Sequence, residues 1–98
     1  MSKETNACSL NALLATTVKK LRTQKGLSQE ELALLASVDR TYISGIERAR
    51  RNITISTLER LIPHLCSGPI DFFSVLCQEI SEAEKKTLSS LQIANLKS

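Results

Sequence analysis

Residues 28–52, SQEELALLASVDRTYISGIERARRN, decide the fold of this chain. Ser28 is a favoured N-cap residue and Glu31 follows three positions later, so the pair predicts a capping box at the start of a short helix. The apolar residues that follow recur at helical spacing and predict one buried stripe, which consists of Leu32, Ala33, Leu35 and Ala36.

A second short helix follows almost at once. Asp39 is its N-cap candidate, and Ile43 and Ile46 recur at helical spacing, which predicts a helix over about residues 40–48. Two helices joined by so short a turn cross steeply and share one core. This is the helix-turn-helix arrangement, whose second helix can enter a DNA major groove.

The outward face of the second helix carries groups that can read base edges. Arg40 can donate two hydrogen bonds to a guanine, while Thr41 and Ser44 can bond to a base or contact a thymine methyl. Gly45 costs about 1 kcal/mol of helix stability relative to Ala, so a glycine here needs a reason. Either nucleic acid approaches the helix closely at this point, or the glycine relieves crowding against another helix. The expected base contacts are Arg40, Thr41, Ser44 and Gly45.

Groups at either end of the motif can hold the phosphate backbone. Gln29 opens the first helix, where a side-chain amide and the helix N-terminus can hold a phosphate. Glu47 is interpreted as a structural acid that orients neighbouring arginines, and acceptance of a hydrogen bond from a cytosine amine is its alternative. The expected backbone contacts are Gln29, Tyr42, Arg48, Arg51 and Asn52.

The run DRTYISGIERARRN resembles the lambda-repressor-like helix-turn-helix regulators, often called the Xre family. Within that family it is similar to the controller proteins of restriction–modification systems, and the lambda-repressor-like match covers about residues 10–66. Ser37 is a departure, because the family usually carries Gly at this place in the turn. The resemblance implies a dimer that binds an operator upstream of its own gene and of a linked endonuclease gene, with RNA polymerase as a further candidate partner.

The charge distribution agrees with a DNA-binding motif. Residues 16–60 carry nine Lys or Arg against five acids, a net of +4, whereas residues 61–98 carry a net of −1. Because the excess positive charge surrounds the helix-turn-helix, it can neutralise phosphates along one edge of the molecule.

Composition and cysteine usage exclude several other classes. With 98 residues the chain is expected to form one small domain. Three cysteines without a CxxC and a single His64 predict neither a disulfide framework nor a metal site, and no cofactor is expected. Cys66 and Cys77 are interpreted as small buried hydrophobes. No leader or transmembrane pattern is present, so the expected compartment is the cytoplasm.

The flanking sequence is expected to be helical throughout, which makes the fold class all-α. Residues 1–8 are expected to form a flexible tail. Ser9 caps a first helix that ends near Lys25 with Gly26 after it, and its stripe consists of Leu10, Leu14, Val18 and Leu21. Residues 53–55, whose apolar residues alternate, are expected to form an extended loop before a fourth helix, and a three-residue strand is the alternative.

Ser56 and Glu59 predict a capping box for that fourth helix, and Pro63 predicts a kink or an early end within it. Gly68-Pro69 starts a fifth helix. Ser81 and Glu84 predict a third capping box, and with it a sixth helix over about residues 82–95. The expected architecture is a five-helix lambda-repressor-like DNA-binding domain over residues 9–80, with an additional C-terminal helix in residues 81–98.

The fifth helix has more apolar residues than one core-facing side can use. An apolar surplus that stays exposed in a monomer indicates an interface, and the controllers that this chain resembles dimerise through their last core helix. The alternative is that Leu88, Leu91 and Leu96 of the sixth helix cover the surplus within one chain. One of the two phenylalanines is expected to belong to the core. The candidate interface residues are Phe72, Phe73, Leu76 and Ile80.

These observations predict a sequence-specific transcriptional regulator that reads a palindromic operator in double-stranded DNA as a homodimer. An enzyme is not supported, because the sequence carries no nucleophile–base pair, phosphate-binding glycine loop or metal cluster. The rival interpretation is an antitoxin-like or adaptor module that uses the same fold to bind a protein. The arginine cluster favours DNA, because it suits phosphates and has no obvious use in an apolar groove.

Overall fold

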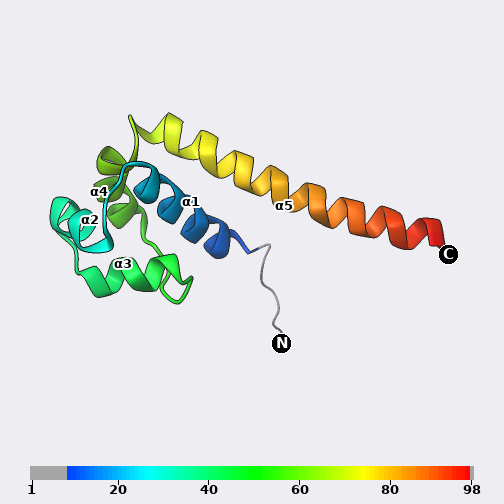
Figure 1. Cartoon of the computed structure of the whole chain (residues 1–98), viewed down its shortest axis with the longest axis horizontal. Helices are drawn as coiled ribbons and strands as arrows, with labels where there is room; N and C mark the ends of the chain where they lie inside the picture. Colours follow the sequence, from blue (N-terminus) through cyan, green and yellow to red (C-terminus); the bar gives the residue numbers. More distant parts are fainter. Residues whose placement is uncertain (1–8, 98) are drawn as a thin grey trace.

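The computed structural model describes residues 9–97, with side chains placed for residues 9–87. The described backbone forms five helices and no strand, so the all-α prediction is confirmed (Figure 1). The expected tail, residues 1–8, lies outside the described residues. The helices are α1 (Leu10–Gln24), α2 (Gln29–Ala36), α3 (Arg40–Glu47), α4 (Ile55–Leu65) and α5 (Pro69–Lys97).

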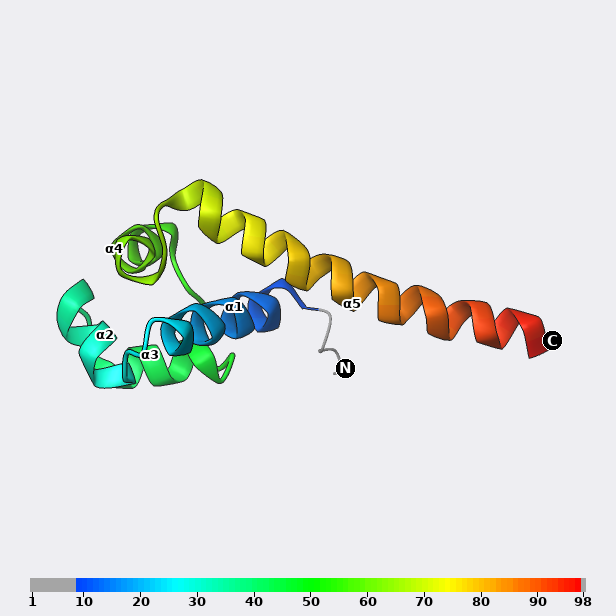
Figure 2. The same cartoon turned by 45° about the horizontal axis from the view of Figure 1, so that its top comes forward.

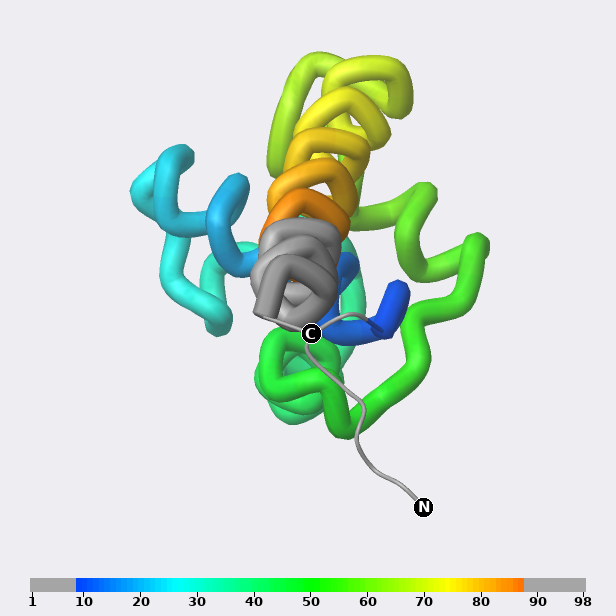
Figure 3. Tube along the Cα trace, turned by 90° about the vertical axis from the view of Figure 1, so that its right-hand side faces the viewer, coloured from blue at the N-terminus to red at the C-terminus, as the bar shows by residue number. Residues whose placement is uncertain are grey.

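Helix α1 is the central element of the domain. It contacts α3, α4 and α5, and Figure 2 shows it running between α3 and α5. The view along α5 places α2 on one side of that helix and the segment from α3 into α4 on the other (Figure 3). The core between these helices is aliphatic apart from one aromatic ring, and its fully buried members include Val18, Leu32, Ile43, Leu61 and Phe72.

The ends of the first three helices follow one pattern. Ser9 and Ser28 cap α1 and α2 through their side chains, and Glu31 completes the expected capping box at Ser28. Each of α1, α2 and α3 is then followed by a residue in the left-handed region: Gly26 at φ 75°, Ser37 at φ 59° and Ala49 at φ 58°. Ser37 therefore adopts a conformation that glycine favours, at a cost in backbone strain.

Helix α4 begins earlier than its sequence predicts. Thr54, and not Ser56, is its N-cap, because the Thr54 side chain accepts a hydrogen bond from the Thr57 backbone N–H at 3.1 Å. Ile53 and Leu58 then occupy the two positions of a hydrophobic staple, and both pack in the core, which fixes where the chain enters the helix. Pro63 does not end α4, which continues to Leu65, so the predicted early end is wrong.

The predicted sixth helix is a continuation of α5, which passes through Ser81 without a break. A cap at Ser81 would require that residue to leave the helical conformation. No glycine or proline interrupts residues 70–97, and extending an existing helix costs less than stopping it and nucleating another. The side chains of Leu88, Leu91 and Leu96 lie outside the described residues.

Three side chains that were expected to be buried are exposed in the structure. Leu10 and Leu35 are 58% and 51% exposed. Cys66 is buried as expected, whereas Cys77 is exposed. Leu10, Leu35 and Cys77 follow the apolar spacing of their helices and are nevertheless exposed, because periodicity alone does not show how wide the buried face is.

Candidate nucleic-acid interface

Helix α3 has one buried and one outward face. Ile43 and Ile46 are fixed in the core with at most 2% of their surface exposed. Arg40 and Thr41 are exposed at the start of the helix, where neither side chain makes a hydrogen bond within the described part of the chain. The N-cap Asp39 also makes no side-chain cap. The first turn of α3 therefore presents free donors to an external partner.

The next turn of α3 is linked to its own C-terminus. Arg48 donates from Nη2 to Oγ of Ser44 at 2.9 Å. This bond joins an expected base contact to an expected phosphate contact. When either side chain takes a bond to DNA, the link must rearrange or be shared, which a hydroxyl with two lone pairs permits.

Gly45 is crowded by the chain's own loop. A Cβ built at this position would lie 2.6 Å from Cγ of Arg51. The Arg51 guanidinium in turn lies 5.5 Å from the centre of the Tyr42 ring, within cation–π range. The structure thus supplies a reason for Gly45 that is neither nucleic acid nor another helix. The expected base contact by Gly45 remains a prediction.

The loop that follows α3 is fastened on both sides. Tyr42 donates its hydroxyl to the backbone oxygen of Asn52 at 3.3 Å. Asn11 of α1 donates its amide to the backbone oxygen of Ala49 at 3.3 Å, a contact that sequence reasoning missed because nothing in the local pattern distinguishes Asn11. The expected backbone contacts Tyr42, Arg48, Arg51 and Asn52 therefore lie together in one compact unit.

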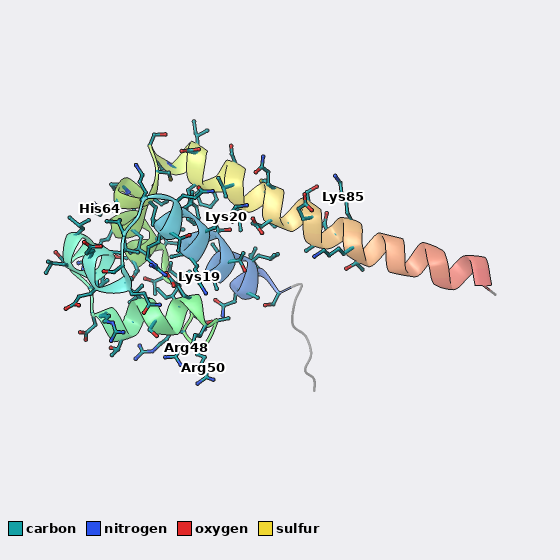
Figure 4. The ribbon with its side chains drawn as sticks, in the orientation of Figure 1. Lys19, Lys20, Arg48, Arg50, His64 and Lys85 are labelled. Atoms are coloured by element: carbon teal, nitrogen blue, oxygen red, sulfur yellow. The ribbon has the colours of Figure 1, made fainter. Side chains whose placement is uncertain are left out.

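Positive charge gathers at this end of the molecule. Figure 4 shows Arg48 and Arg50 beyond the end of α3, with Lys19 of α1 on the neighbouring helix. Lys85 lies far away on α5. Arg48 and Arg50 are both exposed, so they place positive charge at the C-terminal end of α3, and Lys19 is a further exposed cation on α1.

A buried polar cluster joins α1, α2 and α3. Arg22 binds Glu47 through two hydrogen bonds, from Nε to Oε2 at 2.6 Å and from Nη2 to Oε1 at 3.0 Å. Gln29 donates from Nε2 to the same Oε1 at 3.0 Å. The hydrogen bond that Arg22 donates to Glu47 raises the pKa of Arg22 above its usual range, against the opposing effect of burial.

This cluster tests two interpretations from the sequence. Glu47 is a structural acid, as expected, but its partner is Arg22 of α1 and not a neighbouring arginine of the loop. Gln29 was expected to hold a phosphate, and in the free protein its amide is bound to Glu47. Arg22 was not singled out, although an arginine beside the apolar positions of α1 is the signal that could have found it.

The two phenylalanines of α5 face opposite environments. Phe72 is fully buried in the core, whereas Phe73 is 43% exposed, and their rings meet edge to face at 5.4 Å. Leu76 is also buried, so Phe72 and Leu76 belong to the protomer's own core. Ile80 is half-buried. The exposed apolar patch on α5 consists of Ile70, Phe73 and Cys77 and lines a shallow hollow with Pro69 and Ser74.

The described residues lack the features of two other kinds of site. No helix there is long and apolar enough to cross a membrane. The same residues contain no group of three His, Cys, Asp or Glu side chains that could hold a metal ion.

Comparison with known proteins identifies relatives of this chain. A helix-turn-helix family model matches residues 18–62. A hypothetical transcription factor of Neisseria meningitidis is 48% identical over 52 residues, which cover 53% of this chain and 49% of that protein. Control protein C.SmaI of Serratia marcescens is 45% identical over 49 residues, which cover 50% of this chain and 58% of that protein. The chain thus spans about half the length of these two relatives.

Shorter relatives are covered more fully. Control protein C.MunI of a Mycoplasma species is 47% identical over 63 residues, which cover 63% of this chain and 85% of that protein. The crystal structure of the restriction–modification controller protein C.Esp1396I superposes with a TM-score of 0.70 at 45% identity, over 72% of this chain and 93% of that one. The chain therefore belongs to the family of helix-turn-helix controller proteins of restriction–modification systems.

Proposed function

We propose that this protein is a transcriptional regulator that binds a palindromic operator as a homodimer and controls a restriction–modification operon that includes its own gene. The observation that carries the proposal is the outward face of α3. Arg40 and Thr41 are exposed at the start of this helix with free donors, and the exposed cations Arg48 and Arg50 follow its other end. Free donors can read base edges while adjacent cations bind phosphates.

Relatives support DNA as the ligand. C.Esp1396I has been solved as a tetramer in complex with its natural 35 base-pair operator and also bound to a 25 base-pair operator site. We assign base contacts to Arg40, Thr41, Ser44 and Gly45 of this chain. Backbone contacts are assigned to Gln29, Tyr42, Arg48, Arg51 and Asn52.

A homodimer follows from the limited reach of one motif. A single helix-turn-helix reads only a few base pairs, whereas two copies related by a two-fold axis read two half-sites about one helical turn apart. The patch of Ile70, Phe73 and Cys77 on α5, together with Ile80, is the surface that we assign to the dimer contact. RNA polymerase is the partner through which a bound dimer would act on transcription. We assign no catalytic activity to the protein.

The test is a binding titration with the duplex that precedes the gene and with a shuffled duplex of the same length. We expect the native duplex to bind about 10³-fold or more tightly at physiological salt, as specific sites generally do. A footprint on that duplex should show two related half-sites. Equal affinity for both duplexes would contradict the proposal and favour the protein-binding module.

A further inference from the structure

The Arg22–Glu47–Gln29 cluster is an expensive arrangement for a small domain. The Glu47 side chain is 2% exposed and that of Arg22 is 10% exposed. A buried ion pair often contributes no more stability than apolar residues of the same volume, because both charges lose their hydration. Glu47 is also the last residue of α3, where the helix dipole disfavours an acid. Stability alone is therefore a poor explanation for the pair.

The pair instead constrains the orientation of α3. Apolar contacts such as those of Ile43 and Ile46 allow a helix to roll by small amounts on its neighbours. A guanidinium bound to a carboxylate through two parallel hydrogen bonds defines both a distance and a plane. Arg22 is itself held by a further bond, from Nη1 to the Leu27 backbone oxygen at 2.7 Å. The Glu47 carboxylate is thus fixed relative to α1.

Because Glu47 belongs to α3, a constraint on its orientation also constrains the outward face of that helix. Arg40, Ser44 and Glu47 follow one another at spacings of four and three residues, so they lie along one stripe of the helix. A roll of α3 at Glu47 is carried along the stripe to Arg40, two turns away. Gln29, in the first turn of α2, donates a hydrogen bond to the same carboxylate. The proposed phosphate contact is thereby linked to the stripe that contains Arg40 and Ser44.

We propose that Glu47, with Arg22 and Gln29, is a positioning residue that sets the roll of α3 and thereby the sequence specificity of the protein. The inference rests on the proposed function. The cluster fixes Arg40 and Ser44 at the angle at which they meet base edges while the start of α2 lies at the phosphates.

The experiment replaces Arg22 and Glu47 by apolar side chains of similar volume, which form no oriented hydrogen bonds. The double variant Arg22→Met, Glu47→Met keeps the volume and removes both charges, so the fold is expected to survive. A matched control is Lys20→Met, Glu79→Met, which removes the ion pair between α1 and α5, 2.9 Å long, two residues before Arg22 in α1. Arg22→Lys is a second test, which keeps the charge and loses the two-pronged geometry.

Affinity is measured for the operator duplex and for the shuffled duplex. We expect the ratio of the two affinities to fall about tenfold per half-site in the double variant, the size of one lost base contact, with unchanged affinity for the shuffled duplex. Arg22→Lys should lower the ratio in the same direction, and the control pair should leave it unchanged. An unchanged ratio in both Arg22 variants would overturn the inference.

A readout without DNA separates this inference from the proposed function. Residual dipolar couplings of backbone atom pairs in both α1 and α3 report the roll angle of α3 relative to α1, and this angle should differ between the wild type and the double variant. If the wild type fails to discriminate its operator, the proposed function fails while the angle still decides the inference. An unchanged angle in a folded double variant would overturn it whatever the protein binds.

Discussion

The α2–α3 unit and α5 achieve their positions in different ways. Helices α2 and α3 are eight residues each, too short to be stable alone, and specific contacts at their ends hold them: the capping box at Ser28, the αL residues Ser37 and Ala49, and the buried carboxylate of Glu47. Helix α5 is 29 residues long and is fixed in the domain by buried apolar side chains near its start.

This contrast separates structural features that local sequence can predict from those that it cannot. A cap or an αL joint acts through a single residue at one position, so a change there has a local effect. The position of α5 depends on which side of an apolar helix faces the domain, and local sequence does not decide whether Phe72 or Phe73, about 100° apart around the helix, faces inward. The effects of substitutions on stability and binding should therefore differ between the two regions in size and in kind.

The largest effect is expected inside α5. Phe72→Ala removes a fully buried ring and should lower the free energy of unfolding by about 3–5 kcal/mol, because a cavity remains in the core. Phe73→Ala, the matched change one residue later, should cost less than about 1 kcal/mol in a monomer, since that ring is partly solvated. Urea denaturation of both variants measures the difference. Equal losses would contradict the assignment of Phe72 alone to the core.

A charge at the exposed phenylalanine tests the dimer. Phe73→Glu should leave the helical circular dichroism intact and weaken self-association by about 2 kcal/mol or more, because interface aromatics dominate such contacts. Sedimentation should then show a monomer at concentrations where the wild type is dimeric, and operator affinity should fall with it. A variant that remains dimeric would place the interface elsewhere.

Local signals in the sequence predicted most of the helix ends. Ser9, Ser28, Gly26 and Pro69 mark helix ends correctly, because each acts through its own backbone geometry or side chain. The exception is α4, where Thr54 and Ser56 are both competent caps and the core packing of Ile53 decides between them.

Tertiary information was missing elsewhere. The capping box at Ser81 is a local preference that a continuous helix overrides, so the predicted sixth helix is wrong. The partner of Glu47 could not be predicted, since Arg22 is 25 residues away in the chain and meets it only after α1 packs on α3. The DNA-contacting residues stay predictions, and the free side chain of Arg40 is the one with the sharpest test.

That test exploits the unpaired first turn of α3. Arg40→Ala should cost about 1–3 kcal/mol of operator affinity and relax the preference at one base pair in each half-site. Thermal stability should change little, because the Arg40 side chain is exposed and makes no hydrogen bond within the described residues. Binding is measured across a set of operators with single substitutions. A uniform loss over all sequences would show that Arg40 contacts phosphate.

The smallest expected effects come from substitutions to glycine, which compare the two regions directly. Ala49→Gly and Ser37→Gly relieve an αL strain and should each raise the free energy of unfolding by about 1 kcal/mol, after the entropy cost of glycine is subtracted. The bond from Arg60 to the Ser37 backbone oxygen, 3.3 Å long, survives the second change because it involves no side-chain atom of Ser37. Ala83→Gly, inside α5, should lower the free energy of unfolding by up to about 1 kcal/mol, because a helix interior gains nothing from that freedom. Urea midpoints that shift in opposite directions for Ala49→Gly and Ala83→Gly would support the contrast, whereas a loss in both would show that the joint after α3 carries no backbone strain.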